Sequence, residues 1–114
     1  MALTPEMLEA AYEFLRTTEP FRRWKLPHAD DVAFRITRHA DRFGTFDATD
    51  PPQISVSDRV VGHTQTLLMT LAHEMIHLRH HLTREARSDV EHGARFRRHA
   101  ARVCRQHGWD AKAF

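Results

Sequence analysis

The chain has 114 residues, of which 41% are hydrophobic and 28% are charged, and its formal net charge is +2 at pH 7. This length and composition suffice for one hydrophobic core, so we expect a single domain spanning residues 1–114. No apolar run approaches the about 20 residues that a membrane-spanning helix needs, the N-terminus lacks the pattern of a secretory signal, and the single cysteine excludes an internal disulfide, which together predict a cytoplasmic protein without membrane contact.

The first predicted element is an N-terminal helix. Thr4 is a favourable N-cap residue, and Pro5 suits the first helical position. Apolar residues then recur at helical spacing, and the helix is expected to end before Pro20.

Two short strands are predicted next. Residues 32–38 alternate apolar and mostly polar side chains, as in a half-buried strand, and residues 53–57 alternate in the same way. Gly44 and residues 47–52 have turn chemistry between them. The second strand directly precedes the longest predicted helix, so we expect it to border a cleft and to pair with an extended peptide; the alternative is that it lies inside the sheet.

The longest predicted helix covers residues 64–82, which contain neither glycine nor proline. Its apolar residues form one broad stripe, and His73 and His77 lie on the opposite side. The same polar side also contains Thr66, Thr70 and His80. The stripe comprises Leu67, Leu68, Leu71, Met75, Leu78 and Leu82.

Within this helix, residues 73–77 read His-Glu-Met-Ile-His, an HExxH motif. Histidines four residues apart lie on the same side of a helix, so both imidazoles can bind one metal ion. Zinc lowers the pKa of its bound water to roughly 7, and Glu74 lies close enough to accept the proton. The motif therefore predicts a zinc-dependent hydrolase, although ten histidines in the chain also allow a coincidental match.

The third ligand is less well defined. Three and six residues after the motif, the chain has His80 and Thr83 instead of the Gly and His of metzincins. Glu85 and Glu91 are carboxylate candidates, as in thermolysin-like sites. The better candidate is His92, fifteen residues after the motif, where a new helical pattern begins.

The last predicted helix runs from about residue 93 to residue 107 and carries an arginine ridge. We use this name for four arginines at three- and four-residue spacing, namely Arg95, Arg98, Arg102 and Arg105. Arginine binds phosphates well, so the ridge is a candidate surface for DNA or RNA; the alternative is an ordinary solvated face. His80 and His81 are candidate auxiliary residues of the metal site, with plain surface histidines as the alternative.

The predicted order of helix, strand, strand, helix, helix gives an α+β fold. It corresponds to a minimal zincin-like domain, in which a small antiparallel sheet packs on the HExxH helix and a C-terminal helix follows.

The two motifs together resemble a known family. HEMIH, the gap of fifteen residues and then His92-Gly93-Ala94-Arg95-Phe96 are similar to the SprT-like zinc metallopeptidases, which include the Spartan DNA–protein crosslink proteases. The resemblance extends to residues 42–46 and 52–57 and covers roughly residues 5–107.

The resemblance implies one Zn²⁺ per chain, bound by His73, His77 and His92, with Glu74 as the general base. It implies a zinc endopeptidase that cleaves proteins or peptides and whose metal-bound water is activated by Glu74. DNA-associated proteins, as in DNA–protein crosslink repair, are one candidate class of substrate, and the substrate stays open. One departure is clear: the C-terminal zinc ribbon of bacterial members needs paired cysteines, and this chain has only Cys104.

Two alternatives stay open. One is a non-enzymatic, zinc-stabilised module that binds nucleic acid. The other is a regulatory metallopeptidase that cleaves one specific partner. The sequence leaves the oligomeric state open.

Overall fold

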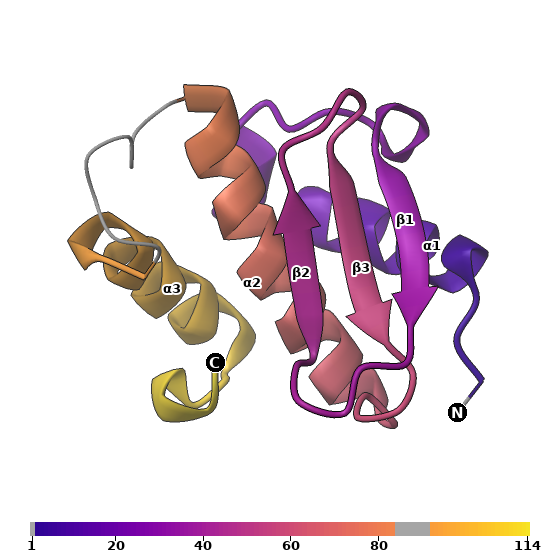
Figure 1. Cartoon of the computed structure of the whole chain (residues 1–114). Coiled ribbons are helices and arrows are strands. Elements are labelled where there is room, and N and C mark those ends of the chain that lie inside the picture. Colours follow the sequence, from indigo (N-terminus) through magenta and orange to yellow (C-terminus); the bar gives the residue numbers. More distant parts are fainter. Residues whose placement is uncertain (1, 84–91) are drawn as a thin grey trace.

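A computed structural model of the chain describes residues 2–83 and 92–114 (Figure 1). Its main elements follow the predicted order, with one additional strand: α1 (Pro5–Arg16), β1 (Ala33–Thr37), β2 (Gly44–Asp47), β3 (Gln53–Ser57), α2 (Thr64–Thr83) and α3 (Ala94–His107). Three short 3₁₀ helices connect or follow them, namely η1 (Phe21–Arg23), η2 (Ala29–Asp31) and η3 (Ala111–Ala113). The α+β class is confirmed.

Helix α1 begins as predicted. The Thr4 hydroxyl accepts a hydrogen bond from the backbone N–H of Met7, and Pro5 occupies the first turn. The buried side of the helix consists of Leu8, Tyr12 and Leu15. Tyr12 also donates a 2.6 Å hydrogen bond to the backbone oxygen of Pro27, which ties α1 to the segment that leads into the sheet.

The sheet is mixed, and β3 is its central strand in the order β1-β3-β2. Strand β3 pairs antiparallel with β2 and parallel with β1. The prediction of an antiparallel sheet is therefore wrong for the β1–β3 pairing. The chain reverses direction once between β1 and β2 and again between β2 and β3, so β3 runs in the same direction as β1.

Strand β2 begins at Gly44, so the predicted turn at this residue is wrong. A Cβ atom at Gly44 would lie 2.8 Å from both the backbone oxygen of Ser55 and Cγ2 of Thr70. The glycine marks a close approach of β2 to β3 and α2. The prediction that residues 53–57 border the cleft is also wrong, because β3 has a partner strand on each side; the alternative of an inner strand is correct.

Helix α2 lies between the sheet and α3, and α1 crosses behind the sheet (Figure 1). The core therefore lies between the sheet and the α1–α2 pair, with Ile54 and Val56 of β3 packed against fully buried residues of α2 such as Leu71 and Met75. Among the described residues, no helix has the length and apolar character needed to cross a membrane. Helix α3 ends as predicted at Gly108, which adopts a left-handed conformation with φ of 73°.

Candidate metal centre

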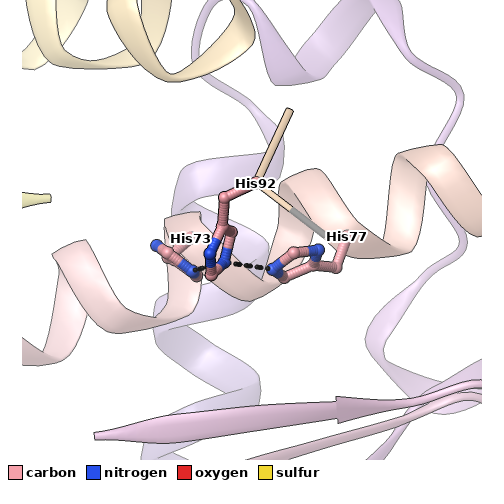
Figure 2. Close-up of side chains that lie close together, drawn as sticks. All are labelled: His73, His77 and His92. Carbon is pink, nitrogen blue, oxygen red and sulfur yellow. Dashed lines mark hydrogen bonds between the residues drawn. The ribbon is translucent and has the colours of Figure 1, made fainter. Parts of the chain in front are cut away.

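Three histidine side chains converge between α2 and the start of α3 (Figure 2). Nε2 of His92 lies 3.1 Å from Nε2 of His73 and 3.2 Å from Nε2 of His77. In a tetrahedral zinc site with Zn–N distances of 2.0–2.1 Å, ligand nitrogens are about 3.3 Å apart. The three imidazoles can therefore hold one metal ion with little movement.

The electrostatic surroundings favour the neutral form of His77. Burial, followed by the electrostatic influence of His92 and His80, lowers the pKa of His77 to about 4. A histidine binds metal through the lone pair of a neutral imidazole, so His77 competes well with protons near pH 7.

Phe96 supports all three candidate ligands from α3. Its ring centroid lies 4.8 Å from that of His73, 4.8 Å from that of His77 and 4.7 Å from that of His92. Phe96 is only 5% exposed and belongs to the hydrophobic core. Because Phe96 packs against rings from both sides of the centre, it fixes α3 against α2.

Glu74 follows His73 on α2 and lies where β2 approaches this helix. The residue is 6% exposed. A Cβ atom at Gly44 would lie 3.4 Å from its Oε2 atom, so the backbone of β2 passes directly beside the carboxylate.

Two cavities meet at this position, and both are lined by Gly44, His73 and Glu74. We name the first the polar cavity; its volume is about 330 Å³, and its other lining residues are Arg42, Thr45, Phe46, Asp47, His77 and His92. We name the second the apolar pocket; its volume is about 440 Å³, and its other lining residues are Phe43, Gln65, Thr66, Met69, Thr70, Ala113 and Phe114. Glu74 therefore lies at the junction of the two cavities.

The remaining candidate residues lie around the centre. His80 is 7% exposed, and its ring packs 5.5 Å from that of His99 and 6.2 Å from that of Phe96, so it is part of the α2–α3 contact and not a surface residue. His81 is exposed, with its ring 5.8 Å from that of Phe46. In the part of the chain that the structure describes, the group that could hold a metal ion consists of His73, His77 and His92. Glu85 and Glu91 lie outside the described residues.

All four members of the arginine ridge are exposed on α3. The buried residues of this helix, Phe96, Val103 and Cys104, lie on its other side. The ridge therefore faces solvent, and among the described residues its members do not line either cavity at the metal centre.

A family model described as the SprT-like family matches residues 8–112. The chain belongs to the SprT-like family. The matched region contains the HExxH helix, the edge strand β2 and His92, so it covers every element of the centre. A comparison with curated proteins found no match. Membership of the SprT-like family suggests a metallopeptidase-like domain, in agreement with three histidines that can hold a metal ion.

Strand β2 and the apolar pocket of this SprT-like domain were not predicted from the sequence. The signal was present in Phe43-Gly44-Thr45-Phe46, where aromatic residues flank a glycine and a β-branched residue. A glycine inside such a run indicates close backbone approach as well as a turn. Met69 and Phe114 could not be found in this way, because they reach the pocket from elements distant in sequence.

Proposed function

We propose that this SprT-like domain is a zinc-dependent endopeptidase with one Zn²⁺ per chain, bound by His73, His77 and His92. The observation that carries the proposal is the convergence of the three Nε2 atoms beside a buried glutamate. When bound, zinc polarises a peptide carbonyl and lowers the pKa of a water molecule.

Glu74 supplies the proton transfers. Its carboxylate accepts a proton from the attacking water, whose oxygen forms a bond to the carbonyl carbon. As the C–N bond breaks, the protonated Glu74 returns the proton to the leaving nitrogen. The products are a carboxylic acid and an amine, and Glu74 ends the cycle ionised.

Strand β2 is well placed to hold the substrate. One of its edges pairs with β3, and the other has no partner strand among the described residues. Gly44 to Asp47 line the polar cavity together with His73 and His77. An extended peptide that pairs with this edge lies across the metal centre.

The test is Glu74→Gln, which keeps the shape of the side chain and removes its basicity. We expect zinc content to stay at about one per chain while cleavage of an unfolded protein falls by about 10²- to 10⁴-fold. Glu9→Gln, on the exposed side of α1, is the matched control and should retain activity. Activity that survives in Glu74→Gln contradicts the role of Glu74 as the general base. A wild-type protein that binds zinc but cleaves no substrate favours a non-enzymatic zinc module.

The exposed arginine ridge supports a second proposal, that the substrates are DNA-associated proteins, as in DNA–protein crosslink repair. Phosphate binding by this ridge predicts an affinity for DNA that falls steeply with salt. We expect the double substitution Arg98→Ala and Arg102→Ala to lower the affinity for DNA and to make its decrease with salt less steep. Arg35→Ala on β1 is the control and should leave both quantities unchanged. Hydrolysis that single-stranded DNA does not stimulate favours a regulatory peptidase with one specific partner.

A further inference from the structure

The apolar pocket differs in chemistry from the polar cavity on the other side of the metal centre. Phe43, Met69 and Phe114 supply its large side chains, whereas Arg42 and Asp47 supply charges to the polar cavity. Apart from that of Glu74 at the junction, no side chain that lines the apolar pocket carries a carboxylate, ammonium or guanidinium group. The two sides of a bound peptide therefore meet different surroundings.

The direction of β2 orients a bound peptide. The chain enters the junction at Phe43 and Gly44, beside the apolar pocket, and runs to Asp47 in the polar cavity. Antiparallel pairing is the commoner arrangement between strands. A peptide paired antiparallel with β2 runs from the polar cavity to the apolar pocket, so the residue after the cleaved bond faces the pocket.

The wall formed by Phe114 is held in place by a series of contacts. Its ring lies 5.4 Å from that of His73 and is stacked with Trp109 at 6.3 Å. Trp109 stacks in turn on His107 at 4.7 Å, and Nε2 of His107 lies 3.1 Å from the hydroxyl of Thr18. These contacts hold the Phe114 wall of the pocket in place and connect it to the segment that follows α1.

We propose that this pocket binds the side chain of the residue that follows the cleaved bond and selects large apolar side chains there. The inference rests on the proposed function and adds a substrate preference to it. A volume of about 440 Å³ accommodates leucine, methionine or phenylalanine. Hydrophobic pockets discriminate between side chains by about 10- to 200-fold, and a similar preference over aspartate is expected here.

The test maps cleaved bonds by mass spectrometry in a peptide mixture derived from unrelated proteins, with zinc-loaded enzyme. Leucine, methionine, phenylalanine and isoleucine should be enriched directly after the cleaved bond. Met69→Glu places a carboxylate in the pocket and should shift the preference at this position to lysine and arginine. Phe14→Glu adds the same charge at a residue that is 53% exposed on α1, and should leave the preference unchanged. Equal zinc content and helicity establish that both variants are folded.

Two outcomes separate the pocket from the proposed function. In the first outcome, cleavage depends on Glu74 but shows no apolar preference after the cleaved bond, or Met69→Glu leaves that preference intact. Either result contradicts the proposed role of the pocket, while the proposed peptidase activity stands. Where no cleavage depends on Glu74, the proposed function fails, and the pocket is tested by binding to the Glu74→Gln protein. A ten-residue peptide with one central phenylalanine should bind at least about tenfold more tightly than the same peptide with aspartate, and equal affinities overturn the pocket.

Discussion

Gly44 of β2 and Thr70 of α2 lie so close together that a Cβ atom on the glycine would be 2.8 Å from Cγ2 of Thr70. The same Cβ atom would also be 2.8 Å from the backbone oxygen of Ser55, which no side-chain rotation can move. Any residue larger than glycine therefore pushes β2 away from the helix that carries the candidate ligands.

Gly44→Ala should destabilise the fold by about 1–3 kcal/mol, because the added methyl group overpacks the contact between β2, β3 and α2. Chemical denaturation followed by circular dichroism measures this loss. Gly62→Ala is the matched control, since nothing lies within 4 Å of the Cβ position there. Similar losses of stability for the two substitutions would show that the close approach at Gly44 does not exclude a larger side chain.

His92→Ala should greatly weaken zinc binding, because it removes one of three converging nitrogens. Removal of a residue that only hydrogen-bonds to a metal ligand lowers metal affinity by roughly 10- to 100-fold, and we expect the loss of zinc affinity here to be larger. Elemental analysis and a competition titration with a chelator measure the effect, and His63→Ala at an exposed position is the control. Zinc bound equally well by His92→Ala would assign the third ligand to another residue.

Acid should weaken the attachment of α1 to η2. Glu13 accepts hydrogen bonds from Arg16 and from the backbone N–H of Ala29, both at 2.7 Å, and chiefly the bond from Arg16 holds the pKa of Glu13 below its usual range. A carboxyl group with a lowered pKa in the folded state binds fewer protons there than in the unfolded chain. Its contribution is thus present above the unfolded pKa of about 4.3 and is lost as the pH falls through the lower folded value.

Glu13→Gln should therefore reduce stability near pH 7 and flatten its decline in acid. Denaturation midpoints between pH 7 and pH 3 give this comparison. Glu9→Gln removes an exposed carboxylate from the same helix and should leave the slope unchanged. Parallel profiles of stability against pH for the wild type and Glu13→Gln would show that Glu13 does not cause the loss of stability in acid.

Cys104 should react slowly with thiol reagents while the protein is folded. The residue is 3% exposed, and burial, followed by the nearby charge of Asp110, raises the pKa of its thiol. Since the thiolate is the reactive form, labelling should be slow in native protein and fast in denaturant. Fast labelling of the native protein would show that the last turns of α3 open readily.

The features that the sequence predicted well depend on local rules. Thr4 and Pro5 mark the start of α1, and the HExxH spacing places two histidines on one side of α2, because both follow from the geometry of a single helix. The position of His92 opposite them was predicted from motif spacing and family resemblance. The order of the strands was not predictable in this way, since it depends on contacts between distant segments.

The buried position of His80 shows a second limit. A helical wheel assumes one buried side, and it placed His80 on the polar side of α2. The sheet and α3 cover α2 from two directions, however, so residues outside the apolar stripe are also buried. The same arrangement makes Thr70 only 7% exposed, although it was placed with the polar residues.

The contacts of Phe96 link the docking of α3 to metal occupancy. The three rings around Phe96 are those that converge on the candidate metal position, so an ion there binds the folded arrangement and not the unfolded chain. By mass action, stability then rises with the free concentration of the ion relative to its Kd. We therefore expect a chelator to lower the denaturation midpoint of this protein by removing an ion from this position.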